Sequence, residues 1–185
     1  MFAVLGCESR LKRSLLTACA ALILAAVGSA EAAPPQGWDK LIPSGASRFK
    51  VLSQFGGEAV LDKETGLTWQ RSPSPTNLFD WGSSAALCIG TAVGGRRGWR
   101  LPSGWELMTL KDPGQSNPAL PPGHPFQDVV ESTIYWTSTA SLVNASSALA
   151  LTFSNGAAGV ITTTKTGLGL RWCLRGPGGD YPGTP

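Results

Sequence analysis

A short basic segment near the middle of the chain has residue types that can bind an anionic ligand. Arg96, Arg97 and Arg100 lie around Trp99 in a segment that also contains glycine. A guanidinium group binds sulfate or carboxylate through two parallel hydrogen bonds, and an indole ring packs well against an apolar sugar face. We therefore take Arg96, Arg97, Trp99 and Arg100 as candidate ligand-binding residues. The alternative that Arg96 and Arg97 form only a solvated turn stays open.

The residue types that usually carry catalysis lack partners in the sequence. His124 is the single histidine and lies in the proline-rich segment Pro121–Pro125, and no serine lies in a Gly-x-Ser-x-Gly motif. Glu106 follows Ser103 by three residues, which is the spacing of a helix capping box rather than of an acid–base pair. We therefore expect a protein that is not an enzyme and that uses no cofactor.

The acidic residues do not form a pattern that suggests a metal site. Asp112, Asp128 and Glu131 lie in or beside a proline-rich stretch, together with Asn117. Ca²⁺ takes about six to eight oxygen ligands, and these side chains are too scattered to supply them. We therefore expect any ligand to be bound without calcium.

Two of the four cysteines are expected to form a disulfide. Cys7 and Cys19 lie in an N-terminal segment that we expect to be removed, so the mature chain keeps Cys88 and Cys173. An even pair of cysteines in an exported protein indicates a disulfide. Closing a loop of about 85 residues stabilises the folded state by roughly 4–5 kcal/mol in the chain-entropy treatment.

The N-terminal segment has the three parts of a signal peptide. A basic stretch at residues 10–13 precedes the apolar run Leu15–Val27, which is shorter than the roughly 20 residues that span a bilayer. Ala30–Ala32 then matches the A-x-A pattern before a signal-peptidase cleavage site. The sequence predicts a signal peptide at residues 1–32 and an exported protein, located in the periplasm or outside the cell.

The sequence offers two alternatives to cleavage after Ala32. Residues 16–19 resemble a lipoprotein processing box that ends at Cys19. Most of the apolar run lies beyond this cysteine, where a lipoprotein signal should already have ended. We therefore do not expect a lipid anchor at Cys19, and cleavage after Ala30 is the second alternative to cleavage after Ala32.

The remaining composition indicates a single loop-rich domain. Removal of residues 1–32 takes away three basic and two acidic residues, which leaves 12 basic and 10 acidic residues and a net charge of +2. This balance is too mild to indicate nucleic-acid binding. Residues 33–47 are rich in Pro, Gly and Ser and predict a flexible leader. The Pro- and Gly-rich residues 177–185 predict a disordered tail.

The pattern of the domain predicts strands, then two helices, then more strands. Asp80 is placed to cap a helix that extends to about residue 92, and Ser103 to cap a short helix that extends to about residue 110. Residues 112–130 form a long irregular loop, and residues 154–156 a tight hairpin turn. The expected strands are 48–54, 58–62, 67–70, 135–141, 148–153, 159–164 and 168–175. The order predicts an α+β fold with antiparallel sheets, in which Trp136 and Trp172 belong to the core.

Four short motifs, taken together, resemble the Lcl C-terminal domain family. The first resembles D-x-x-T-G-L-x-W, the second W-R-L-P-[ST]-x-x-E-L, the third Y-W-[ST]-S and the fourth C-V-R-G. They stand at Asp62–Trp69, Gly98–Leu107, Tyr135–Ser138 and Cys173–Gly176. Because Trp99 and Arg100 belong to the second motif, the resemblance also implies that these two residues are half-buried parts of the framework, whereas Arg96 and Arg97 are freer.

The resemblance covers about residues 48–176 and implies a C-type-lectin-like fold on an exported bacterial protein. The name-giving member is described as trimeric and as binding sulfated glycosaminoglycans, so a homo-oligomer is implied as well. The expected function is a lectin-like binding or adhesion domain for glycans or an anionic polysaccharide. The alternative is an envelope module that binds a protein partner through an exposed apolar patch, which we place near the long loop.

The signal-peptide assignment predicts the mass of the exported protein. Because Ala30–Ala32 fits the peptidase site best, the protein recovered after export should begin at Ala33. Intact-mass spectrometry of the exported protein measures this directly. Processing that is blocked by globomycin, or a lipid-modified Cys19, would contradict it.

Overall fold

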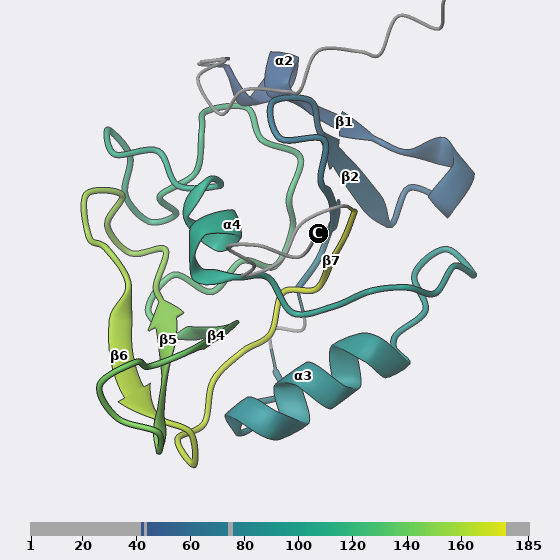
Figure 1. Cartoon of the computed structure of the whole chain (residues 1–185). Coiled ribbons are helices and arrows are strands. Elements are labelled where there is room, and N and C mark those ends of the chain that lie inside the picture. The colour runs from purple at the N-terminus through teal and green to yellow at the C-terminus, as the bar shows by residue number, and fades with distance from the viewer. Residues whose placement is uncertain (1–41, 43, 74–75, 177–185) are drawn as a thin grey trace, which may run out of the picture. The chain divides into compact units, whose positions relative to one another are not determined.

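The computed structural model describes residues 42, 44–73 and 76–176, all of which belong to one compact unit (Figure 1). The predicted signal peptide, Cys7, Cys19, most of the predicted leader and the predicted tail lie outside the described residues. The elements are α2 (Gly45–Arg48), β1 (Phe49–Val51), the 3₁₀ turn Ser53–Phe55, β2 (Ala59–Asp62), β3 (Thr68–Gln70), α3 (Trp81–Gly90), α4 (Gly104–Met108), β4 (Tyr135–Ala140), β5 (Ser147–Leu151), β6 (Ile161–Thr164) and β7 (Leu174–Arg175).

The described residues form two antiparallel sheets, as the sequence predicted. One has four strands in the order β1-β2-β3-β7, and the other has three in the order β4-β5-β6. In the first sheet Val51, Val60, Trp69 and Leu174 stand opposite one another across the strands. Because strand side chains alternate between faces, this row belongs to one face, which packs into the larger of two hydrophobic clusters. The side chains at the alternate positions of these strands therefore lie on the opposite face of the sheet.

Asp62 is the centre of a buried hydrogen-bond network at the end of β2. Its carboxylate accepts hydrogen bonds from Arg48 Nε and Nη2 at 2.8 and 2.6 Å, from Glu64 N at 3.0 Å and from Thr65 Oγ1 at 2.8 Å. Gly66 follows with a φ of +73°, a backbone conformation that favours glycine. The D-x-x-T-G motif therefore builds the turn between β2 and β3.

The helical turn α2 includes residues that the sequence analysis assigned to the flexible leader 33–47. Gly45 N donates to Pro122 O at 2.9 Å, and a Cβ at Gly45 would collide with the backbone of the long loop. Arg48 Nη2 also donates to Thr109 O at 2.7 Å. The turn is therefore held by tertiary contacts, which local composition does not encode.

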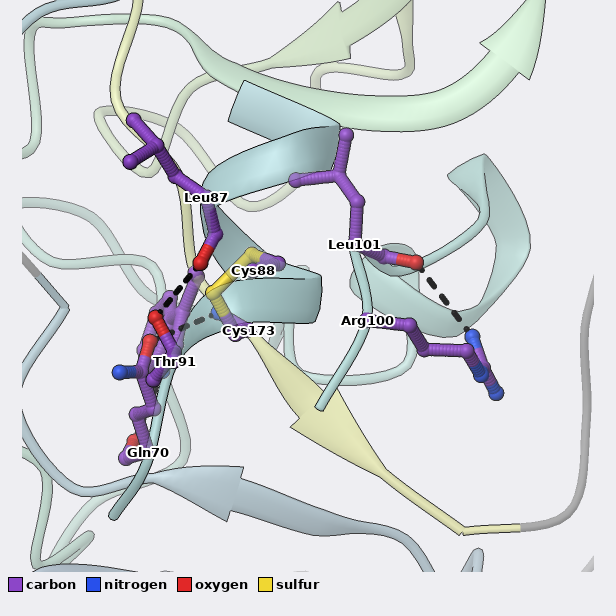
Figure 2. Close-up of a disulfide and its surroundings, with 8 residues drawn as sticks. Gln70, Leu87, Cys88, Thr91, Arg100, Leu101 and Cys173 are labelled. Atoms are coloured by element: carbon purple, nitrogen blue, oxygen red, sulfur yellow. Dashed lines mark hydrogen bonds between the residues drawn. A yellow bond between two sulfur atoms is a disulfide. The ribbon is translucent and has the colours of Figure 1, made fainter. Parts of the chain in front are cut away.

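The first predicted helix begins where expected and carries the predicted disulfide. Asp80 caps α3 by accepting from Ser83 N at 2.9 Å and from Ser83 Oγ at 2.8 Å, and the Ser83 backbone bond lowers the pKa of Asp80. Cys88 is bonded to Cys173 with a Cα–Cα distance of 5.5 Å. Cys173 N also donates to Gln70 Oε1 at 2.9 Å, so the bridge ties α3 to the edge of the four-stranded sheet (Figure 2).

The last predicted strand, 168–175, is broken into pieces with different partners. Only Leu174–Arg175 forms β7, whereas Leu170 accepts from Trp136 N at 2.9 Å beside the other sheet. Cys173 O accepts from Gln70 N at 3.1 Å. The segment therefore passes from one sheet to the other, and a continuous strand cannot form.

The long loop 112–130 is irregular throughout, as predicted, but the hairpin of β5 and β6 has a longer connection than the tight turn predicted at 154–156, with a turn closed by a hydrogen bond from Ala158 N to Asn155 O at 3.3 Å. β5 ends at Leu151 and β6 begins at Ile161. Gly156 N donates to Gln115 O at 3.0 Å, and a Cβ on Gly156 would collide with the Asp112 carbonyl. This glycine therefore serves a close approach to the long loop rather than a two-residue hairpin.

Trp136 and Trp172 are fully buried, as predicted. Trp172 is surrounded by aromatic rings in the larger cluster, whereas Trp136 belongs to the second cluster with both disulfide cysteines. None of the helices in the described ranges has the length and apolar content that crossing a membrane requires.

Loss of the Asp62 charge should destabilise the fold. Asp62→Asn removes one member of a buried ion pair, so the free energy of unfolding should fall by about 3 kcal/mol. Urea unfolding followed by tryptophan fluorescence gives this value. Asp128→Asn is the matched control, because Asp128 is exposed and already has a φ of +54° that Asn tolerates. Equal stabilities of the two variants would contradict the role of Asp62.

Candidate functional site

The outer face of the four-stranded sheet carries basic side chains in register. Lys50, Leu61, Thr68 and Arg175 stand opposite one another across β1, β2, β3 and β7. They alternate with the row that packs into the larger cluster, so they lie on the opposite face. Lys50 is exposed and Arg175 is half-buried. The two edge strands of one sheet therefore place a cation at each end of this row.

Phe55 links this row to the predicted basic segment. The guanidinium of Arg96 lies 4.9 Å from the centre of the Phe55 ring, and that of Arg175 lies 6.0 Å from it. Phe55 is buried and makes an edge contact with Trp99 at 6.1 Å between ring centres. Cation–π attraction holds both guanidinium groups against one ring without using their hydrogen-bond donors.

A tight turn fixes the position of Arg96. Arg96 N donates to Val93 O, and Val93 N donates to Arg96 O, both at 3.0 Å. Gly94 has a φ of +54°, and a Cβ there would collide with the Phe55 backbone. The exposed Glu58 accepts from Gly94 N at 2.7 Å, which ties the turn to the start of β2. Both contacts are made by Gly94, and they hold the turn against residues 55–58.

Arg97 extends the same turn into solvent. Its side chain is exposed, and its Nη1 makes one long contact of 3.4 Å with Gly90 O. We name Lys50, Arg96, Arg97 and Arg175 the basic face. Glu58 lies beside it, and its carboxylate is already engaged by a backbone donor. The arrangement is suited to binding an extended anion through several guanidinium groups.

Trp99 cannot stack on a ligand, so its assignment to a binding site is corrected. It is only 2% exposed, and its Nε1 donates to Arg96 O at 2.7 Å. The indole packs in the second hydrophobic cluster, together with Val93 and Leu101. Its physical role is to support the turn that carries Arg96.

Arg100 is likewise part of the framework. Its guanidinium forms two hydrogen bonds with the nearly buried Glu106 carboxylate, at 2.8 and 2.6 Å. Glu106 also closes the predicted capping box of α4, accepting from Ser103 N at 2.8 Å while Ser103 Oγ accepts from Glu106 N at 3.1 Å. The Arg100 backbone exchanges two hydrogen bonds with Leu174, the residue that follows Cys173. The two guanidinium nitrogens of Arg100 are therefore already bonded to Glu106 and are not free to bind an anion together.

Lys50 and Arg175 are members of the basic face that the sequence analysis did not select. The available signal was alternation: residues two apart in a strand share a face, and paired strands align those faces. The sequence placed Arg171, Cys173 and Arg175 together, but only Arg175 reaches the basic face. Cys173 is buried, and Arg171 lies over the Phe79 ring at 5.0 Å.

His124 lies in a half-buried position against Phe126, with their ring centres 5.9 Å apart. Its Nδ1 is buried without a hydrogen-bond partner, and desolvation lowers the pKa of the imidazole. Across residues 42, 44–73 and 76–176, no group of three or more His, Cys, Asp or Glu side chains is placed to hold a metal ion. The basic face is therefore the candidate site that the geometry supports.

Comparison with known families agrees with the motifs. A family model described as the Lcl C-terminal domain matches residues 58–175, which confirms the resemblance. The match contains the first three motifs entirely and the fourth up to Arg175. No curated protein matches the chain.

The environment of His124 predicts loss of stability in acid. Its folded-state pKa is lowered, so below its unfolded value of about 6.5 the unfolded chain binds a proton that the folded chain resists. The free energy of unfolding should therefore fall as the pH drops from 7 to 5, and less steeply in His124→Gln. Urea titrations at both pH values measure the two slopes. Parallel slopes for the wild type and the variant would refute this contribution.

Proposed function

The chain belongs to the Lcl C-terminal domain family, and we propose that it is an exported, non-enzymatic binding or adhesion domain. Its proposed ligand is an anionic polysaccharide, such as a sulfated glycan, bound without calcium. The proposed fold is C-type-lectin-like. This is supported by the two antiparallel sheets, by a last strand that pairs back onto β3, and by the disulfide from α3 to the segment before β7.

The observation that carries this proposal is the basic face. Arg96 and Arg97 are exposed, and none of the ion pairs found among the described residues involves them or Arg175. By contrast, Arg48 and Arg100 are committed to buried or half-buried carboxylates. Arg96, Arg97 and Arg175 thus belong to one surface and form no ion pair, whereas Arg48 and Arg100 hold the framework.

The chemistry of these groups favours sulfate or carboxylate on an extended chain. A guanidinium offers parallel N–H donors that match two oxygens of such a group. Several separated cations bind a polymer with repeated charges better than a small monovalent ion, because each contact adds within one complex. Salt screens such contacts, so binding should weaken as ionic strength rises.

The alternative, an envelope module that binds a protein partner, receives support from a different residue. None of the large exposed apolar side chains lies between residues 112 and 130, so the long loop itself supplies no apolar patch. Trp105 on α4 is 73% exposed, and such a side chain is typical of a protein-binding hot spot. Trp105 is one residue, whereas the basic face combines four cations, so the basic face is the stronger candidate.

Neutralising the turn should weaken polysaccharide binding. In Arg96→Gln/Arg97→Gln, loss of charge-assisted contacts should raise the Kd for heparin or dextran sulfate about tenfold, with a smaller dependence on salt. Calorimetry at two salt concentrations measures both effects, and EDTA should leave the wild type unchanged. Because both side chains are exposed, the free energy of unfolding should change by no more than about 1 kcal/mol.

The matched control is Lys165→Gln, which removes one charge from the turn after β6 and leaves the basic face intact. Its Kd should equal that of the wild type. Equal loss of affinity in both variants would indicate a general effect of net charge. Unchanged affinity in the double arginine variant would refute the assignment of the basic face.

A further inference from the structure

Two apolar side chains protrude from the connection between β4 and β5. Leu142 and Val143 have relative exposures of 102% and 97%, so neither packs against the rest of the chain. Single exposed apolar residues are common on protein surfaces, but two adjacent ones that lose no exposure on folding are not explained by core packing. A contact with another molecule would explain why both apolar side chains are exposed.

The backbone of this connection is ordered by its own hydrogen bonds. Ser141 Oγ accepts from Val143 N and from Asn144 N, both at 3.3 Å, and Asn144 Oδ1 accepts from Ser146 N at 2.9 Å. Ser141 N donates to Ser147 O at 3.0 Å across the base. Most backbone donors of the connection are therefore satisfied internally, which lowers the cost of moving it into an apolar medium.

The turn after β6 lies beside this connection. Lys165 N donates to Ser146 O at 2.9 Å, and Lys165 Nζ donates to Ala145 O at 2.8 Å. Leu168, three residues further along, is 61% exposed. Both connections lie at the lower end of the domain in Figure 1. We name Leu142, Val143 and Leu168 the apolar tip.

The charge around the apolar tip is positive. Residues 141–146 and 165–168 contain one charged side chain, Lys165, and no carboxylate. The nearest acidic residue in the adjoining chain is Asp80, which precedes the Trp81 whose N donates to Lys165 O. Asp80 is occupied in capping α3 through Ser83. A cation at the base of a protruding apolar turn is the arrangement that complements an anionic lipid surface.

We propose that the apolar tip inserts into the surface of a lipid bilayer, with Lys165 at the level of the anionic headgroups. Lipid molecules rearrange around a protruding turn, whereas a protein partner would need a pocket of matching shape. This proposal goes beyond the polysaccharide-binding function and uses none of the residues of the basic face.

Vesicle sedimentation of the exported, processed protein tests the proposal. The probes are vesicles of phosphatidylglycerol with phosphatidylethanolamine, and vesicles of phosphatidylcholine alone. The wild type should bind the anionic vesicles more strongly. Leu142→Ser/Val143→Ser should lower the partition coefficient about tenfold, because both apolar side chains are replaced by polar ones. The variant should fold normally, because these side chains make no contacts to lose.

Two control variants separate this site from the other exposed groups. Ile89→Ser replaces an exposed apolar residue near the other end of α3 and should leave the partition coefficient unchanged. Arg96→Gln/Arg97→Gln should retain vesicle binding while it loses polysaccharide binding. The two assays therefore distinguish loss of lipid binding at the apolar tip from loss of polysaccharide binding at the basic face.

Three results would overturn the proposal. The first is no binding of the wild type to either kind of vesicle. The second is equal binding by the wild type and Leu142→Ser/Val143→Ser. The third is a dimer in light scattering that the double serine variant abolishes, since the tip would then contact a second copy of the chain rather than lipid.

Discussion

The structure depends on keeping buried carboxylates satisfied. Transfer of an ionised carboxylate out of water costs several kcal/mol unless donors surround it, and removal of its partner is more costly than never having buried the pair. Asp62 and Glu106 are both almost fully buried, and each is held by an arginine and by backbone donors. The polar residues of the first two family motifs therefore belong to these two hydrogen-bond networks. Trp69 and Leu107, from the same motifs, are buried core residues.

These two networks also determine where the candidate site lies. The Asp62 turn joins β2 to β3, and this pairing aligns Lys50 with Thr68 and Arg175 across the sheet. The Glu106–Arg100 pair holds the chain beside Leu174, so β7 remains against β3. Four of the arginines thus fall into two pairs with different physical roles. Those facing carboxylates hold the fold, and those resting on the Phe55 ring keep their donors for solvent or a ligand.

Most features that depend on neighbours in sequence were predictable, and among the distant contacts the Cys88–Cys173 disulfide was predicted from the cysteine count. The Asp80 cap and the capping box at Ser103 follow from local spacing. Two features did not follow from it. The division of strand 168–175 between two sheets requires the tertiary position of Trp136. The burial of Trp99 also depends on the approach of Phe55, which lies more than forty residues earlier in the chain.

The division between framework and function follows the same logic. Three residues of the basic face and all three residues of the apolar tip lie outside the four motifs, and none of these side chains forms an ion pair with a buried carboxylate. Only Arg175 belongs to a motif, and it reaches the surface because strand alternation sends Leu174 inward and Arg175 outward. A fold of this kind does not specify its ligand. The loops between its helices and strands determine the ligand, because their exposed side chains are the ones that can contact another molecule.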